Sequence, residues 1–171
     1  MTMRSLVRNV FNRPVTRTIR TAPHRLRPAL EALEHRWVRS TIVVNNFTDA
    51  HVPGQIDLRE AIASANAASE ATTIQFAPSY VPIILQGTTG GANGLELTNK
   101  HYAVTIQGPT DSLIVEASDQ TGIDHINHIF YIGPLAHATI SNLWIVDGFD
   151  ENPADGGGGM LNYGTVSLTN C

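Results

Sequence analysis

The sequence contains a single cysteine, Cys171, and no long apolar run. One thiol cannot form an intrachain disulfide, so the cysteine content excludes a small disulfide-stabilised scaffold and does not indicate a redox compartment. No stretch approaches the roughly 20 apolar residues that cross a bilayer as a helix. The sequence therefore predicts no membrane span.

Positive charge is scarce after residue 40. Residues 1–40 contain nine of the eleven basic residues, all of them arginine, and carry a net charge of +7. Residues 41–171 contain only Arg59 and Lys100 against thirteen acidic residues, and carry a net charge of −11. A basic segment therefore precedes an acidic body.

The composition of residues 1–40 is typical of a disordered or targeting segment, because it is rich in arginine and poor in large apolar residues. It shows no conventional secretory signal, since Arg8 and Asn9 interrupt its apolar stretch. Single strands of nucleic acid bind aromatic side chains interleaved with basic ones, and Phe11 and Trp37 are too few for such a surface. We therefore expect no nucleic-acid partner.

Residues 54–67, GQIDLREAIASANA, predict an amphipathic helix. Apolar residues recur at i, i+3, i+4 and i+7 and so share one face. These residues are Leu58, Ala61, Ile62 and Ala65. Asp57 stands at the N-cap position and Glu60 follows three residues later, which is an Asp-led form of the capping box. A helix this short is marginal alone in water, so we expect its apolar face to lie on a larger body.

The rest of the chain alternates short runs rich in Ile, Val, Leu and Thr with turns rich in Gly, Pro, Asn and Asp. The runs that predict strands are TTIQF, PIILQG, LELTN, AVTIQG, SLIVEA, HIFYIG, ATISNLWIV and GTVSLTN. Three loosely similar runs begin at Tyr102, His137 and Gly164, with spacings of 35 and 27 residues. A repeat of this size, whose strands cannot bury a face alone, predicts a solenoid. The helix would then cover the N-terminal end of the stack.

The segment STIVVNNFTDAHVPGQIDLREAIASANAASEATTIQF, residues 40–76, resembles the start of bacterial right-handed parallel β-helix proteins of the pectin-lyase-like type. Asp57 stands where that family often has Ser. The segments ISNLWI and GGGMLNYGTVSLTNC resemble later coils of the same family. LEALEHRWVRS, residues 30–40, resembles a short motif of large surface and secreted bacterial proteins, with Arg39 in place of the usual Pro. The resemblance implies an all-β, right-handed parallel β-helix (solenoid) with one N-terminal amphipathic capping helix, in a secreted or cell-surface protein.

These observations predict three parts: a basic disordered or targeting segment at 1–40, an N-terminal cap of strand plus helix at 41–70, and β-helix coils at 71–171. The last residues, Gly164–Cys171, carry no charge and include no capping helix. A solenoid needs its final coil covered. We therefore expect a β-helix truncated at its C-terminus, which self-associates through its last coil.

Catalytic side chains are hard to find in the coils. The resemblance implies that a polysaccharide lyase would place an Arg or Lys base beside a carboxylate-bound calcium ion. Lys100 is the one cation between residues 71 and 171, and we expect it in a turn. Arg59 lies off the apolar face of the predicted helix, where a solvated or paired side chain is the ordinary case. We assign no catalytic residue.

The densest acidic cluster is DGFDENPAD, in which Asp147, Asp150, Glu151 and Asp155 are candidate calcium ligands. The spacing is not that of an EF-hand loop, and a solvated loop is the alternative.

His125 and His128 would point to opposite faces of a strand but could converge on a metal in a turn.

Two functions remain open, because the fold does not specify a reaction. The first is a noncatalytic secreted or cell-surface module, structural, adhesive or glycan-contacting, whose partner is a polysaccharide or cell-surface glycan. The second is a polysaccharide lyase or glycoside hydrolase, which the resemblance and the acidic cluster support. Apart from the calcium ion, the sequence implies no cofactor.

Overall fold

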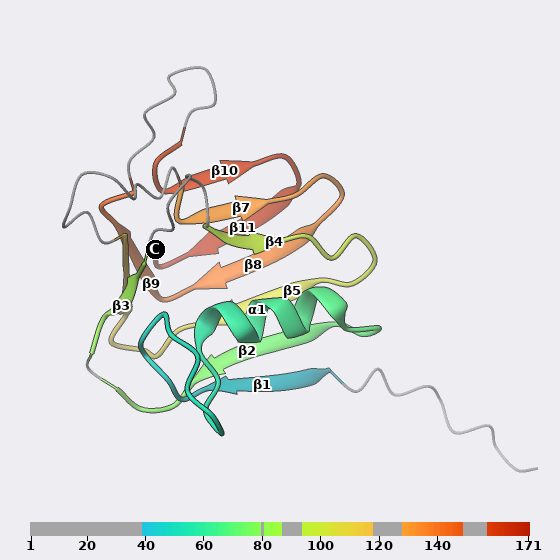
Figure 1. The fold of residues 1–171 in the computed structure, drawn as a ribbon. Helices are drawn as coiled ribbons and strands as arrows, with labels where there is room; N and C mark the ends of the chain where they lie inside the picture. Colours follow the sequence, from blue (N-terminus) through green and yellow to red (C-terminus); the bar gives the residue numbers. More distant parts are fainter. Residues whose placement is uncertain (1–38, 80, 87–93, 118–127, 149–156) are drawn as a thin grey trace, which may run out of the picture. The chain divides into compact units, whose positions relative to one another are not determined.

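The computed structural model describes residues 39–79, 81–86, 94–117, 128–148 and 157–171. Within these ranges, eleven strands and one helix form a β-solenoid of about three turns (Figure 1). The predicted parallel β-helix is thus confirmed. The basic segment falls almost wholly outside the described residues, so its disorder stays a prediction.

The strands form three parallel sheets, which we call A, B and C. Sheet A contains β1 (Ser40–Val44), β2 (Thr72–Phe76), β5 (Val104–Gln107), β8 (His137–Ser141) and β11 (Thr165–Thr169). Sheet B contains β3 (Ile83–Leu85), β6 (Leu113–Ala117) and β9 (Leu143–Val146). Sheet C contains β4 (Leu95–Leu97), β7 (Phe130–Ile132) and β10 (Met160–Asn162). From β2 to β10 the chain visits A, B and C in turn, so each of these three rungs consists of one strand from each sheet.

Alternation along the strands decides which side chains fill the solenoid. Ile74, Ile106 and Ile140 are paired in register across neighbouring strands, and each is 0% exposed. Successive side chains of a strand point to opposite faces, so the residues between them face solvent. Val104 and Ile106 of β5, two residues apart, are likewise both buried.

The spacing of the rungs is irregular. Val104 pairs with Ala138, and Ala138 pairs with Val166, which gives steps of 34 and 28 residues along sheet A. The three similar runs of the sequence each lead into a strand of this sheet. The extra residues of each step lie in the connections between sheets.

One predicted strand is two strands in the structure. ATISNLWIV divides at Asn142, whose φ of 55° turns the chain from β8 in sheet A to β9 in sheet B. Asn tolerates this left-handed conformation better than most residues. Asn170 has a φ of 52° and donates to Asn142 Oδ1 at 3.2 Å, so the corner residues of two rungs are bonded. Strand β10 was also not among the predicted runs.

The predicted helix is confirmed as α1 (Leu58–Ala67), the one helix in the described part of the chain. Asp57 accepts a hydrogen bond from Glu60 N at 2.8 Å, and Glu60 accepts one from Asp57 N at 3.2 Å, which completes the capping box. The predicted apolar face is buried, with Leu58 1%, Ala61 0%, Ile62 3% and Ala65 0% exposed.

Helix α1 takes the place of a strand beside β4, and it also contacts β1 and β2 (Figure 1). Asn66 donates to Glu96 O at 2.7 Å and accepts from Thr98 N at 2.9 Å, so it bonds the edge of β4 as a strand would. In return, Asn99 donates to the helix carbonyls of Ala65 and Ala68, at 3.0 and 3.1 Å. The helix therefore covers the N-terminal part of the solenoid, as predicted.

No helix among the described residues has the length and apolar character needed to cross a bilayer.

Candidate functional site

The outer faces of sheets A and B differ sharply in chemistry. The outward residues of sheet A are Thr41, Val43, Thr73, Gln75, Thr105, Gln107, His137, Thr139, Ser141, Thr165, Ser167 and Thr169. Eight of these twelve side chains carry a hydroxyl group, and none is Asp, Glu, Lys or Arg. Neighbouring rungs are bonded here by Gln75 Nε2, which donates to Gln107 Oε1 at 3.3 Å.

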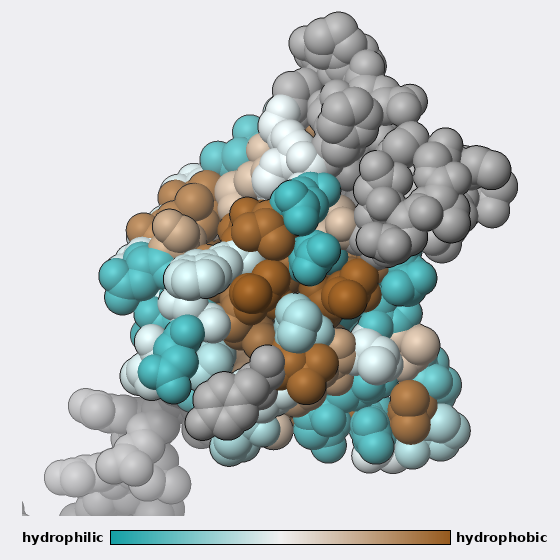
Figure 2. Space-filling view, turned by 90° about the vertical axis from the view of Figure 1, so that its left-hand side faces the viewer, coloured by the Kyte–Doolittle hydropathy of each residue, from teal (hydrophilic) through white to brown (hydrophobic). Residues whose placement is uncertain are grey.

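The outer face of sheet B is mostly apolar. In register, Ile114 lies beside Trp144, and Glu116 lies between Ile84 and Val146. Trp144 is 56% exposed and Ile84 is 40% exposed. Figure 2 turns the side of β3 and β9 toward the reader and shows apolar side chains gathered at its middle, with polar ones among them. We call the outward residues of sheet B, together with Val81 and Pro82, the apolar face.

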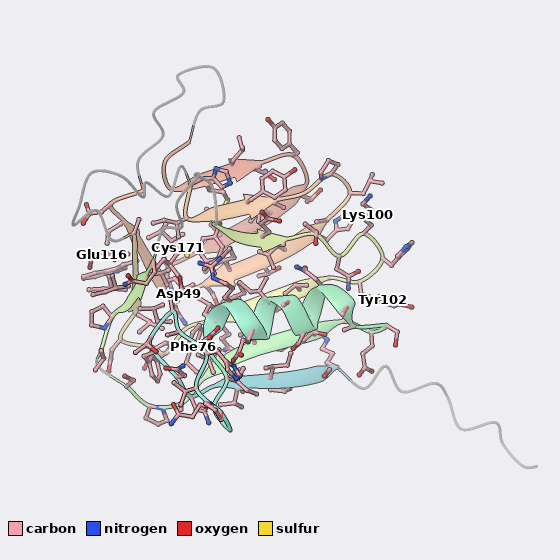
Figure 3. All side chains as sticks on the ribbon, viewed as in Figure 1. Asp49, Phe76, Lys100, Tyr102, Glu116 and Cys171 are labelled. Atoms are coloured by element: carbon pink, nitrogen blue, oxygen red, sulfur yellow. The ribbon has the colours of Figure 1, made fainter. Side chains whose placement is uncertain are left out.

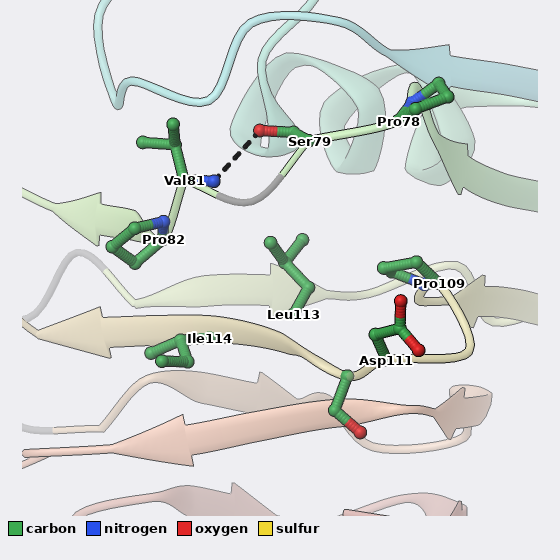
Figure 4. Close-up of a pocket in the computed structure, with 9 residues that line it drawn as sticks. Pro78, Ser79, Val81, Pro82, Pro109, Asp111, Leu113 and Ile114 are labelled. Atoms are coloured by element: carbon green, nitrogen blue, oxygen red, sulfur yellow. Dashed lines mark hydrogen bonds between the residues drawn. The ribbon is translucent and has the colours of Figure 1, made fainter.

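A hollow of about 200 Å³ adjoins the apolar face where β3 and β6 begin (Figure 4). Its lining residues are Pro78, Ser79, Val81, Pro82, Pro109, Asp111, Ser112, Leu113 and Ile114. Each proline fixes its own φ, which restricts the walls of the hollow. Ser112 has a φ of 58° and donates through its backbone N–H to Pro109 O at 3.1 Å, which closes the turn before β6.

The hollow combines apolar walls with a few polar groups. Val81 and Ile114 line the hollow, and Figure 4 shows the carboxylate of Asp111 beside Pro109. The Ser79 hydroxyl accepts from Val81 N at 3.1 Å and keeps its own proton to donate. At about 200 Å³ the hollow is smaller than the roughly 300–1,000 Å³ of sites that enclose a whole ligand.

A second cleft, of about 570 Å³, lies beside α1 and contains the pair Asp49 and Arg59. Arg59 donates through Nε to Asp49 Oδ1 at 2.9 Å and through Nη2 to Asp49 Oδ2 at 2.8 Å. It also donates to Gly94 O at 3.1 Å, and Asp49 accepts from Gln86 N at 2.8 Å. These bonds join the helix to the residues that follow β3 and precede β4.

The hydrogen bonds to Asp49 raise the pKa of Arg59 above its ordinary value. A general base must lose its proton before it can accept one, and a guanidinium held by a carboxylate resists that loss. Arg59 is therefore a paired residue, one of the two ordinary cases expected from the sequence.

Lys100 is exposed in a bend at residues 100–102. Figure 3 places Lys100 and Glu116 on opposite sides of the solenoid, so the lysine is remote from the apolar face. Within the described part of the chain, Lys100 forms no ion pair with an acidic side chain.

The candidate calcium ligands fall largely outside the described residues. Asp150, Glu151 and Asp155 lie there, whereas Asp147 is exposed directly after β9 with a φ of 60°. Where side chains are described, no three His, Cys, Asp or Glu residues group so as to hold a metal ion. The calcium site stays a prediction.

The histidine pair is likewise only half described. His125 lies outside the described residues, and the ring of His128 has its centroid 5.7 Å from that of Tyr131. A metal site at this pair stays a prediction.

We compared the chain with protein-family models, curated proteins and solved structures, and none of the three comparisons found a match. The parallel solenoid is a property of the structure itself, whereas the pectin-lyase-like resemblance rests on the sequence motifs alone.

Sequence reasoning did not single out Trp144 or the hollow. The available signal was the run LWIV, in which every residue is apolar although only one face of the strand can point inward. When the outward positions of a strand are also apolar, the strand presents an exposed apolar patch, and such patches often mark binding surfaces.

Proposed function

We propose that this chain is a noncatalytic β-solenoid module of a secreted or cell-surface protein, and that its apolar face holds an extended glycan. The observation that carries the proposal is the exposed Trp144, one rung from Ile114 and the hollow.

The chemistry of this surface suits a sugar chain. A pyranose ring has an apolar C–H face and a rim of hydroxyl groups, so it can pack on an indole while its rim bonds polar groups. Trp144 and Ile114 supply the apolar contact, and Asp111, Ser112 and Ser79 supply donors and acceptors at the hollow. Successive rungs lie about 4.8 Å apart, so a chain that runs along the solenoid axis meets similar chemistry at each step.

Charge favours a neutral glycan over an acidic one. Residues 41–171 carry a net charge of −11, which repels uronate polymers. Of the two cations in this range, Arg59 is bonded to Asp49 and Lys100 lies on another side of the solenoid. The glycan we propose therefore differs from the acidic polysaccharides that the resemblance implied.

The alternative is a polysaccharide lyase or glycoside hydrolase. It is supported by the resemblance and by the acidic cluster at residues 147–155. Release of unsaturated or reducing sugars from polygalacturonate or alginate would establish it in place of the proposal.

A glycan array probed with the 171-residue chain tests the proposal. The protein should bind neutral glycans. Trp144→Ala should raise the dissociation constant of the tightest-bound glycan at least tenfold, because aromatic side chains that a ligand buries contribute most of the binding energy. Tyr163→Ala is the matched control, since Tyr163 is 57% exposed but is not part of the apolar face. Retention of acidic glycans alone, or equal binding by both variants, would contradict the proposal.

A further inference from the structure

Glu116 is the one charged side chain among the described outward residues of sheet B. It follows Ile114 on the outer face of β6 and lies in register between Ile84 and Val146. Figure 3 labels it at the side of the solenoid that carries β3 and β9. A molecule that covers the apolar face removes water from this carboxylate, which is costly unless the molecule supplies a partner.

The described part of the chain supplies no such partner. The Glu116 side chain forms no hydrogen bond or ion pair with a described residue. Among the described residues that line the hollow, Asp111 alone is charged. Asp147, exposed directly after β9, is acidic as well. The charge that compensates Glu116 must therefore come from the ligand.

Glu116 and Trp144 are placed to contact the same sugar. Trp144 pairs with Ile114, so Glu116 lies one strand away from Trp144 and two positions further along. Strands about 4.8 Å apart, with a rise of about 3.3 Å per residue, put the Cβ atoms of such a pair roughly 8 Å apart. Both side chains project from the outer face, and the substituents of a pyranose ring stacked on the indole extend toward the carboxylate.

The chemistry of the missing partner is that of an amine. A sugar hydroxyl can donate a hydrogen bond to a carboxylate, but it leaves the negative charge uncompensated once the sugar covers it. An ammonium group donates a stronger, charge-assisted hydrogen bond and also neutralises the charge. The net charge of −11 on residues 41–171 acts in the same direction, because it attracts cationic ligands.

We propose that the apolar face prefers a glycan with free amino groups, and that Glu116 is the residue that determines this preference. The inference rests on the proposed function, because it assigns a class of sugar to the same site. Trp144 holds the ring of a neutral sugar and of an amino sugar alike, and Glu116 adds affinity for the amine. Acetylation of the amine removes its charge and therefore removes this added affinity.

Two β-linked oligomers of equal length, one of glucosamine and one of N-acetylglucosamine, test the preference. Calorimetric titration of the 171-residue chain, at a pH below the ordinary pKa of an amino group, measures both dissociation constants. The glucosamine oligomer should bind about tenfold more tightly, which is the scale of a hydrogen bond to a charged group. Glu116→Gln should reduce this difference to less than about twofold by weakening the binding of the glucosamine oligomer.

Glu70→Gln is the matched control, because Glu70 is exposed between α1 and β2 and its substitution removes the same charge. This variant should keep the full difference between the two oligomers. Equal effects of Glu70→Gln and Glu116→Gln would overturn the inference, since the preference would then arise from net charge alone.

The result for the parent chain separates this inference from the proposed function. Equal binding of the two oligomers would overturn the preference and leave the proposed function in place, because stacking on Trp144 requires no charge. Binding of neither oligomer would also overturn the preference, whereas the glycan array would still decide the proposed function. Trp144→Ala should weaken the binding of both oligomers, unlike Glu116→Gln, which acts on their difference.

Discussion

The two ends of the solenoid are built from similar residues and differ in what covers them. Near the N-terminal end, Leu58 and Ile62 of α1 are 1% and 3% exposed, and Asn66 bonds the edge of β4. At the C-terminal end, Leu168 is 49% exposed and the backbone groups beside it point away from β8. An apolar side chain therefore contributes to stability according to its neighbours on the next rung, and a helix can supply those neighbours as well as a strand can.

The largest expected effect is a difference between two leucine substitutions. Leu58→Ala should lower the free energy of unfolding by about 2–5 kcal/mol, the usual cost of a cavity at a buried leucine. Leu168→Ala should lower it by less than about 1 kcal/mol, because half of that side chain already meets water. Urea unfolding followed by circular dichroism, at a concentration where the chain is monomeric, measures both. Equal losses would show that the two ends are equally covered.

A smaller effect is expected from the hydrogen bonds that join the helix to the solenoid. Asn99 is 6% exposed and donates to Ala65 O and Ala68 O, so Asn99→Ala removes both of these bonds, although Ala65 O still accepts from Ala68 N. The expected loss is about 1–3 kcal/mol in the free energy of unfolding. Gln107→Ala, on the exposed face of sheet A, is the control and should stay within about 0.5 kcal/mol of the parent. A loss no larger than that of the control would mean that α1 is held by its apolar face alone.

Low pH should destabilise helix α1 near the N-terminal end and leave strand β11 near the C-terminal end unchanged. A hydrogen bond with His51, and a second with the backbone of Asp57, hold the pKa of Glu60 below its ordinary value of 4.5. Ionised Glu60 thus stabilises the folded state, and this contribution is complete at a pH above the pKa that Glu60 has in the unfolded chain. The contribution is lost as the pH falls through the lower pKa that Glu60 has in the folded protein. Hydrogen exchange, corrected for the pH dependence of the intrinsic rates, should show that the amides of α1 lose protection below about pH 4.5. The protection of β11 should not change over this range, because the stretch Gly164–Cys171 carries no charge. Glu60→Gln should remove this pH dependence of α1.

The smallest expected effect is a difference in proteolysis. Lys100 is exposed in a bend, whereas Arg59 lies on α1 and is bonded to Asp49. Limited trypsin digestion should therefore cleave after Lys100 before it cleaves after Arg59, and should remove arginine-rich pieces of residues 1–40 first. Mass spectrometry of the fragments measures the order. Early cleavage after Arg59 would show that α1 opens more readily than the rest of the described structure.

Features with a local cause could be predicted from the sequence. The helix follows from the apolar period of Leu58–Ala67 and from the capping box of Asp57 and Glu60, which are interactions within one or two turns. The inward faces of the strands follow from alternation, as at Val104 and Ile106. The solenoid followed from the repetition of such runs, and its parallel strands from the resemblance to parallel β-helix proteins.

The tertiary structure decided everything that depends on register between rungs about 30 residues apart. Asn142 became a corner because the strands before and after it pair in different sheets, and Asn66 became a substitute for a strand because β4 lies beside it. Trp144 gained a neighbour in Ile114 through the same stacking. Asp49 gained a partner in Arg59 because the segment after β1 folds back beside α1. Periodicity shows which side of a strand faces outward, but only the parallel pairing of rungs determines which outward side chains stand together.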